Sequence, residues 1–342
     1  MNDSLEDFRL NYTDLVDQRV GGKALATSDD WFAECENLVN HDEPIFRPGH
    51  FVTTGQWMDG WESRRSFGRR RRDQAGVDHD WCILRLGIPG IIHGVDIETT
   101  HFTGNAPEYA SLEGAWVDGS LSTDMQWFEL LAKSTTDSDD HNFFKIDDAR
   151  PCTHLRLKIY PDGGVARLRA WGSPKLLKEN YVVGELVDLA SVMIGARGQQ
   201  CSDKFYSSPS NLLMPNPGAN MGDGWETRRR RDNGNDWCVI KLGVAGTIRK
   251  VILDTAHFKG NYPESFSLEA TLSASQDLQP EQVRWQTIIA NTPLQADQLH
   301  LYIKQILATS EQQFSHVRLN IFPDGGVSRI RIFGTPDWAA AR

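Results

Sequence analysis

Two short polar motifs in this chain carry the side chains that proton transfer and anion binding require, and each motif occurs twice. Residues 59–65 read DGWESRR and return at 223–229 as DGWETRR. Residues 101–108 read HFTGNAPE and return at 257–264 as HFKGNYPE. A carboxylate can accept a proton, an imidazole titrates near neutral pH, and a guanidinium can hold a carboxylate through two parallel hydrogen bonds. The motifs therefore indicate acid–base chemistry on a small anion.

The repeated polar residues form two sets of candidates. The candidates for proton transfer are Glu62, His101, Glu226 and His257. The candidates for substrate binding are Arg64, Arg65, Asn105, Glu108, Arg228, Arg229, Asn261 and Glu264. Structural alternatives exist for each type, because a glutamate can brace an adjacent arginine and an asparagine after glycine is typical of a turn. Their return in both copies favours a functional role for the set.

Arginines are concentrated directly after the first motif. They occupy positions 64, 65 and 69–72 in the first copy and 228–231 in the second. Because the formal net charge is −10, we interpret these clusters as local anion sites and expect no nucleic-acid or membrane partner. The alternative is that single arginines form salt bridges with Glu62, Glu226, Asp73 or Asp232. An extra stretch at 66–76 in the first copy leaves the pairing of the two clusters open.

The sequence does not specify a metal. It contains no HExxH, HxH or CxxC pattern and no Gly-rich phosphate loop. His101, Glu108, Glu62 and Asp162 are nitrogen and oxygen ligands of the type that Mn²⁺ accepts, and one hypothesis is that they converge. No closed four-ligand pattern of the zinc type is present, so we expect no tightly bound structural metal. Mn²⁺ remains a candidate cofactor.

The motifs belong to a longer internal repeat. Residues 80–87, DWCILRLG, return at 236–243 as DWCVIKLG, and the YPDGGV of 160–165 returns as FPDGGV. The order is identical, and the period of roughly 160 residues is far longer than that of a solenoid repeat. The repeat predicts two domains, at 15–174 and 185–336, joined by a charged linker at 175–184. Each domain is long enough to bury its own core.

Antiparallel strands are the elements that must position these motifs. Apolar and polar residues alternate at 91–98, 154–159 and 165–171, and short apolar runs occupy 81–86 and 237–242. Segments of period two bounded by Gly, Pro and Asp are typical of half-buried strands. The second copy repeats them at 248–254, 316–321 and 327–333. Helical periodicity is weak, and its best candidates are 29–39 and 298–307. The pattern predicts an all-β sandwich in each repeat.

The order of these strands resembles the galactose-binding-like, discoidin-type jelly roll. The resemblance covers each repeat, and it implies two tandem jelly-roll β-sandwich domains with ligand-binding loops at one end. The loops that carry the repeated polar residues are 58–80, 99–109 and 160–165 in the first repeat. Their counterparts are 222–236, 255–265 and 322–327.

The motifs taken together, GWE[ST]RR, DWC, HF[TK]GN and PDGGV in both copies, resemble the allantoicase family over nearly the whole chain. The resemblance implies hydrolysis of allantoate to ureidoglycolate and urea in purine catabolism. Under that hypothesis a repeated glutamate activates water, a repeated histidine protonates the departing urea, an arginine binds the carboxylate and an asparagine orients a ureido group. One repeat or both can be catalytic. The fold alone also suits a non-catalytic pair of jelly rolls that binds a carbohydrate-type ligand.

Cysteine usage and hydropathy indicate the compartment. The five cysteines, at 35, 82, 152, 201 and 238, are odd in number. Cys82 and Cys238 occupy equivalent positions in separate repeats, so free thiols in a reducing compartment are expected. Residues 1–7 lack the apolar core of a secretory signal, and no run approaches the ~20 apolar residues of a membrane span. We expect a cytoplasmic protein, and a homo-oligomer is left open.

Overall fold

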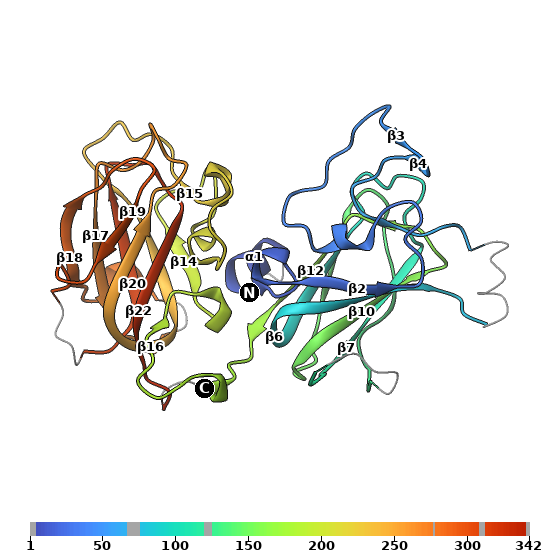
Figure 1. Cartoon of the computed structure of the whole chain (residues 1–342), viewed down its shortest axis with the longest axis horizontal. Coiled ribbons are helices and arrows are strands. Elements are labelled where there is room, and N and C mark those ends of the chain that lie inside the picture. The colour runs from blue at the N-terminus through green and yellow to red at the C-terminus, as the bar shows by residue number, and fades with distance from the viewer. Residues whose placement is uncertain (1–4, 67–75, 120–124, 276–277, 308–311, 340–342) are drawn as a thin grey trace. The chain divides into compact units, whose positions relative to one another are not determined.

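The computed structural model describes residues 5–66, 76–119, 125–275, 278–307 and 312–339. The chain forms two compact units, Met1–Lys175 and Leu176–Arg342, which are drawn in Figure 1. Arginines 69–72 and Asp73 lie outside the described residues. Within the described part, no helix is long and apolar enough to cross a membrane.

The regular structure of the first unit is almost wholly antiparallel strand. Its helical segments are α1 (Leu5–Asn11) and the 3₁₀ helices η1 (Gln18–Val20) and η2 (Cys35–Val39). Its strands are β1 (Thr13–Asp14), β2 (Lys23–Thr27), β3 (Phe51–Val52), β4 (Gly55–Gln56), β5 (Trp61–Glu62), β6 (Asp80–Glu98), β7 (Tyr109–Ala115), β8 (Phe128–Thr135), β9 (His141–Lys145), β10 (Cys152–Tyr160), β11 (Gly164–Val165) and β12 (Arg167–Pro174).

The second unit repeats this plan. Its 3₁₀ helices are η3 (Lys178–Asn180), η4 (Val192–Ile194), η5 (Pro209–Leu213), η6 (Met221–Asp223) and η7 (Pro280–Gln282). Its strands are β13 (Val187–Asp188), β14 (Arg197–Cys201), β15 (Trp225–Glu226), β16 (Asp236–Asp254), β17 (Ser265–Thr271), β18 (Gln286–Pro293), β19 (Leu299–Tyr302), β20 (Phe314–Phe322), β21 (Gly326–Val327) and β22 (Arg329–Pro336). The order β13-β22-β16-β20-β17-β18 matches β1-β12-β6-β10-β7-β8 in the first unit. The predicted all-β fold in two tandem repeats is confirmed.

The longest strand of each unit joins the two layers of its sandwich. Residues 82–85 of β6 pair with β2 and β10, whereas residues 90–98 pair with β12 and β9. The strand therefore changes neighbours near Gly87, and β16 does the same in the second unit. The sequence pattern predicted two separate strands here, at 81–86 and 91–98. That expectation is wrong, because glycine lets the chain bend while new neighbours take over the pairing.

Both helix predictions are also wrong. Residues 29–39 contain only η2, at the end of the segment. Residues 298–307 contain strand β19, which pairs with the second half of β16. A free strand edge is available to this segment, and tertiary pairing of this kind overrides a weak helical pattern.

The charged side chains of the last long strand are buried, contrary to the expected half-buried pattern. Arg167 is fully buried, and Arg169 is only 7% exposed. Arg167 Nε donates to the carbonyl of Asp42, and its Nη2 lies 3.0 Å from an Asp59 carboxylate oxygen. Arg329 makes the equivalent contacts with Asn216 and Asp223 in the second unit. Buried arginine is retained in both units because it holds the loop segment that covers this strand.

The repeated aromatic residues fill the end of each sandwich core. Trp61 and Phe102 are fully buried in the first unit, as are Trp225 and Phe258 in the second. A Cβ on Gly164 would overlap the ring of Phe102, so glycine is required where the ring packs on the backbone.

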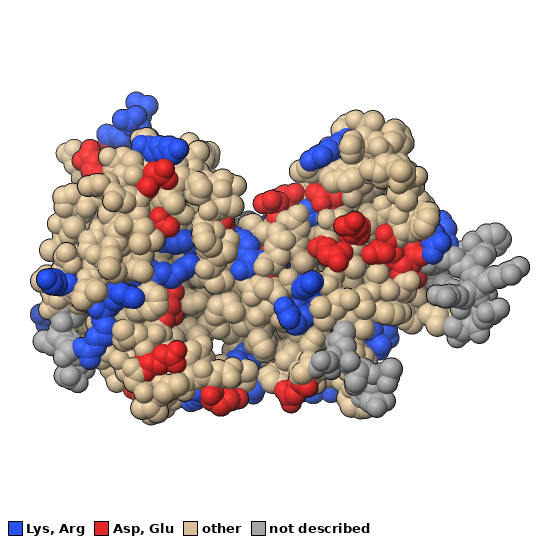
Figure 2. All heavy atoms as spheres, in the orientation of Figure 1, with Lys and Arg blue, Asp and Glu red and all other residues tan. Residues whose placement is uncertain are grey.

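The surface is mixed in charge, and Figure 2 shows no continuous basic stripe on the visible face.

Candidate active site

Strand β5 places a tryptophan and a glutamate on opposite faces at the loop end of the first unit. Trp61 points into the core, and its indole N–H donates to the carbonyl of Asp29 at 2.8 Å. Successive side chains of a strand alternate, so the next residue, Glu62, faces away from the core. Asn105 Nδ2 donates to Glu62 Oε1 at 2.8 Å, which joins the two repeated sequence motifs.

The PDGG turn holds Asn105 against Glu62. The amide of Gly164 donates to the carbonyl of Asn105 at 2.8 Å, and Gly164 itself pairs with Glu62 in the β5–β11 ladder. Asp162 accepts from the amide of Ser66 at 2.6 Å. The turn thereby connects all three loops that carry the repeated polar residues.

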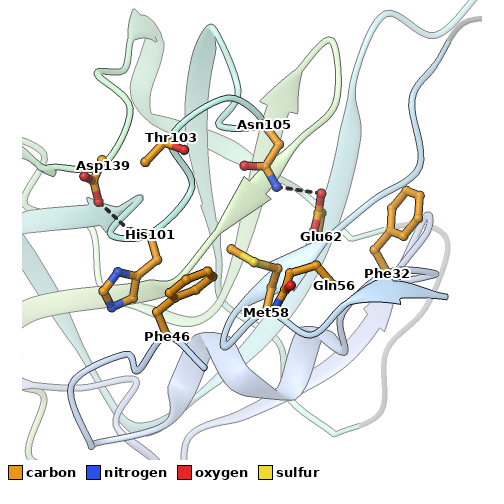
Figure 3. A pocket seen from close by; sticks show the side chains of 10 residues that line it. Phe32, Phe46, Gln56, Met58, Glu62, His101, Thr103, Asn105 and Asp139 are labelled. Carbon is orange, nitrogen blue, oxygen red and sulfur yellow. Dashed lines mark hydrogen bonds between the residues drawn. The ribbon is translucent and has the colours of Figure 1, made fainter. Parts of the chain in front are cut away.

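Glu62 and Asn105 line a cavity of about 460 Å³. Figure 3 shows Glu62 and Asn105 joined by a hydrogen bond, with Gln56, Met58 and the ring of Phe46 below them in the view. The remaining lining residues are Phe32, Gly55, His101, Thr103 and Asp139. The wall combines the apolar side chains of Phe32, Phe46 and Met58 with six polar or ionisable residues, so it offers hydrogen-bond partners as well as apolar surface to a small molecule.

Burial sets the ionisation of the cavity carboxylate. Removal from water raises the pKa of Glu62, while the Asn105 amide and the nearby Arg65 charge oppose that rise. A carboxylate with an elevated pKa is a stronger proton acceptor than an exposed one. Glu62 is therefore suited to take a proton from water.

His101 has a defined structural task as well as a place in the cavity wall. Its backbone is left-handed, with φ 72°, and its amide donates to an Asp139 carboxylate oxygen at 2.7 Å. Its ring Nε2 lies 3.1 Å from the carbonyl oxygen of Pro44. A carbonyl only accepts, so Nε2 carries the hydrogen and Nδ1 is the nitrogen left for chemistry. Non-glycine residues with positive φ often occur at functional sites.

The two predicted binding arginines of the first unit have different surroundings. Arg64 Nε and Nη2 both donate to Asp29 Oδ2, at 2.8 and 2.6 Å, and the guanidinium lies over the ring of Trp31. Arg65 contacts Asp162 at 3.1 Å and the carbonyl of Gly104 at 3.2 Å. Arg64 thus braces the fold. Arg65 lies next to the Asn105 loop with a side chain that is 61% exposed.

The second unit reproduces the central contacts. Asn261 Nδ2 donates to Glu226 Oε1 at 2.5 Å. His257 has φ 71°, its amide donates to Asp297, and its Nε2 lies 2.8 Å from the carbonyl oxygen of Gly218. Arg228 pairs with Asp203 at 2.7 Å, as Arg64 does with Asp29.

The surroundings of these contacts differ between the units. The segment between the 3₁₀ helix and the glutamate strand is residues 40–60 in the first unit and only 214–224 in the second. In the second unit the sulfur of Met221 approaches Asn261 Nδ2 at 3.7 Å. Arg229 is exposed and has no hydrogen-bond or ion-pair partner among the described residues. Arg230 pairs with Asp232 and Asp236.

Other predicted residues lie away from the cavity. Glu108 and Glu264 are exposed, and their backbone amides bond to Tyr160 and Phe322. The hypothesis that His101, Glu108, Glu62 and Asp162 converge on one metal ion is wrong. In the described part of the chain, the groups able to hold an ion are Asp30, Cys35 and Glu36, and separately Glu43, Glu98 and His141.

Sequence reasoning missed two parts of the site. It did not single out Phe46, Gln56 and Met58, although the longer segment before Trp61 in the first copy was a visible signal. It also treated Arg167 and Arg329 only as strand residues. Their position two residues after each GGV was the signal, because a charge retained twice in an apolar strand requires a buried partner.

Comparison with known proteins gives consistent matches. The family model described as the allantoicase repeat matches residues 13–175 and 187–337. The chain is 44% identical to a probable allantoicase of Pseudomonas aeruginosa, over 98% of this chain and 99% of that protein. It is 43% identical to an allantoicase of Dictyostelium discoideum, over 93% and 86%. The crystal structure of an allantoicase from Saccharomyces cerevisiae matches with a TM-score of 0.79 at 33% identity, covering 97% of this chain and 98% of that one.

Proposed function

The chain belongs to the allantoicase family, and we propose that the cavity of its first repeat is the site of hydrolysis. The protein is a hydrolase that cleaves a carbon–nitrogen bond of allantoate and forms ureidoglycolate and urea. The observation that carries the proposal is the Glu62–Asn105 pair inside the cavity of about 460 Å³.

The reaction sets three chemical requirements. The ureido nitrogen that leaves must gain a proton, because the urea anion is a poor leaving group. The second ureido nitrogen donates its electron pair to the central carbon as the first bond breaks. Water then adds to that carbon and loses a proton. The sum is addition of one water, with urea and ureidoglycolate as the products.

Glu62 is the proposed base. Its partly buried carboxylate takes the proton from the attacking water, and the partial burial, which raises the pKa of Glu62, strengthens it as a base for this step. Asn105 holds Glu62 Oε1 through one N–H. The remaining amide groups of Asn105 can pair with a ureido N–H and C=O.

His101 is the proposed acid. Its Nε2–H is held by the Pro44 carbonyl, so the proton that passes to the leaving nitrogen comes from Nδ1 of the imidazolium. Transfer leaves a neutral ring that water can reprotonate. The positive φ and the bond from its amide to Asp139 fix the direction of the ring.

Arg65 is the proposed partner of the substrate carboxylate. It lies beside Gly104 and Asn105, and its positive charge acts to lower the pKa of Glu62. Arg65 makes a single bond to Asp162, at 3.1 Å, and one to the carbonyl of Gly104, which leaves its other N–H groups for a substrate. Arg64 is less suited, because both its Nε and Nη2 already donate to Asp29.

The first repeat is favoured over the second because of its longer loop. Phe46, Gln56 and Met58 wall the cavity, and all come from the 40–60 segment. The second repeat has the same Glu–Asn and His–carbonyl contacts, but there the sulfur of Met221 lies against the Asn261 amide. We propose that the second repeat retains these contacts for folding.

The matched variants Glu62→Gln and Glu226→Gln test this assignment. We expect Glu62→Gln to lower kcat for urea release by about 10²–10⁴-fold, the usual contribution of a general base. Glu226→Gln, which removes the same charge from the same motif, should stay within a few-fold of the parent. Equal losses in the two variants would show that both repeats work, and loss only in Glu226→Gln would move the site to the second repeat.

The cellular setting is also a proposal. Four of the five cysteines are buried and Cys201 is partly exposed, which supports a reducing compartment and hence the cytoplasm. Recovery of active protein only from an oxidising compartment would contradict this.

A further inference from the structure

A second group of ionisable side chains lies in the first repeat, next to the segment that holds His101. Glu43, Glu98 and His141 each direct one ligand atom into a common space, and these atoms lie within 4.8 Å of one another. We propose that the three side chains bind one divalent transition-metal ion. One imidazole and two carboxylates form a ligand set suited to Mn²⁺ or Zn²⁺.

The orientation of His141 supports ligation through Nε2. Its Nδ1 lies 2.7 Å from Asp96 Oδ2, so in the neutral ring the N–H is on Nδ1 and the lone pair is on Nε2. Histidines that bind metals typically donate the other ring N–H to a carboxylate in this way. Nε2 lies 3.9 Å from Glu98 Oε1, which is too long for a hydrogen bond. Two ligand atoms at about 2.1 Å from one tetrahedral ion lie about 3.4 Å apart, so binding requires the two side chains to approach each other by roughly half an ångström.

Asp96 provides an independent observation. It is fully buried, and its Oδ1 has no hydrogen-bond partner among the described residues. Its Oδ2 faces His141, so the carboxylate is directed at the cluster. A buried carboxylate with an unsatisfied oxygen is costly unless positive charge lies nearby. A metal ion on His141 would supply that charge through the ring.

The neighbouring cations have other partners. Arg167 pairs with Asp59, and Arg169 donates to the carbonyls of Asn40 and His41. Arg9 on α1 is close enough to affect His141 electrostatically, but it repels the imidazolium form. The His141 side chain is 37% exposed and Glu43 is exposed, which leaves an entry path from water.

The second repeat shows that the jelly roll does not require this group. The pair Glu98–His141 in the β6–β9 ladder corresponds to Asp254–Leu299 in β16–β19. Asp96 corresponds to Ile252, because each precedes that pair by two residues on its strand. Pro217 takes the place of Glu43, next to the carbonyl that accepts from the buried arginine. The cluster is therefore specific to the repeat that contains the cavity.

A bound ion would connect the sheet to the cavity wall. Glu43 immediately precedes Pro44, whose carbonyl holds His101, and Phe46 lines the cavity two residues later. Glu98 accepts from the hydroxyl of Thr100, which immediately precedes His101. We assign the ion a positioning task, and it touches no atom of the substrate.

The test is binding of Mn²⁺ to the full chain after metal removal, with free Mn²⁺ counted by electron paramagnetic resonance. We expect one site per chain, and at least a tenfold weaker affinity in each of Glu43→Gln, Glu98→Gln and His141→Gln. Asp96→Asn should weaken binding by about 10–100-fold, the usual effect of losing the carboxylate behind a ligating histidine. Glu43 is exposed, so its variant remains informative if a buried variant fails to fold.

Three controls separate this site from the alternatives. Asp254→Asn changes the counterpart of Glu98, and it should bind Mn²⁺ like the parent. Cys35→Ser should also bind normally, and loss of the site there would place the ion at the other group and overturn the assignment. Glu62→Gln should keep full Mn²⁺ affinity, because the inference does not depend on the proposed active site. Unchanged affinity in Glu43→Gln and His141→Gln, or absence of Mn²⁺ and Zn²⁺ binding in the parent, would refute the proposal.

Discussion

The two repeats share the same local contacts but differ in what surrounds them. Each has a buried tryptophan, a Glu–Asn bond, a left-handed histidine held by a carbonyl and a buried arginine under the covering loop. The first repeat adds a longer segment before Trp61 and a longer one after Arg65. The first of these walls a cavity, and the other lies largely outside the described residues.

This difference teaches that a repeated motif does not by itself identify a working site. The paired contacts hold the loops at the end of each jelly roll, and that task is the same in both repeats. A substrate also requires a concave site, and part of its wall comes from residues outside the motif such as Phe46 and Gln56. Matched substitutions in the two repeats separate the contacts that stabilise the fold from those that act on the substrate.

The largest expected effect separates the two histidines. His101→Asn and His257→Asn keep a side chain that tolerates positive φ, so both should fold. Loss of the acid in His101→Asn should lower kcat by about 10²–10⁴-fold. His257→Asn should change kcat only slightly. Steady-state urea release, with the melting temperature of both variants measured alongside, decides between them.

A result with equal melting temperatures and equal, small losses of activity would assign both histidines to the fold. The acid would then have to be sought elsewhere in the cavity. A large loss of kcat in His101→Asn alone, at an unchanged melting temperature, would support the assignment.

The second prediction concerns what the repeats share. Gly164→Ala and Gly326→Ala place a methyl group against the rings of Phe102 and Phe258. Overpacking of this kind should cost about 3 kcal/mol in each repeat. Denaturant unfolding should show a similar loss for both variants. If only one variant is destabilised, the two turns do not have the same structural role in the two repeats.

The third prediction concerns pH. His316 is fully buried, and burial together with Lys241 and Arg197 lowers its pKa to about 4. The unfolded state binds this proton at higher pH, so stability from His316 is present above about pH 6.5 and is lost as pH falls toward 4. Between pH 7 and pH 5 the second repeat should lose roughly 2 kcal/mol.

The matched variants for this effect are His316→Gln and His154→Gln, at equivalent positions of β20 and β10. Burial also lowers the pKa of His154, so both should reduce the acid sensitivity of their own repeat. Denaturant unfolding at pH 7 and pH 5 gives the difference. An unchanged pH dependence of the unfolding free energy in His316→Gln would show that this histidine does not cause the loss of stability in acid.

The smallest expected effect concerns the arginines. Arg65→Lys keeps the charge but loses the planar fork. Because Arg65 is 61% exposed, we expect a loss of only about 1 kcal/mol in binding, or roughly a fivefold rise in KM. Arg229→Lys should leave KM unchanged. Arg64→Lys should lower stability instead, because it breaks the paired bonds to Asp29. A rise in KM for Arg229→Lys would bring the second repeat back as a binding site.

Much of the fold could be predicted from the sequence, because its signals are local. Alternation over 154–159 and 316–321 identified strands, and PDGG identified turns. The failures were also local: the segments 29–39 and 298–307 had weak patterns that distant strands reassigned. Glycine near position 87 suggested a chain break, although the strand continues.

The sequence by itself determined the duplication, the two all-β repeats and the family, since these depend on the order and type of residues along the chain. Only the tertiary structure decided which polar groups meet. Asp29 takes Arg64 away from the substrate, Asn105 joins Glu62, and Asp96 orients His141. Each of these pairs is separated by more than thirty residues. Such contacts, and the burial that raises the pKa of Glu62, exist only after the sandwich has closed, because desolvation depends on the packing of distant segments.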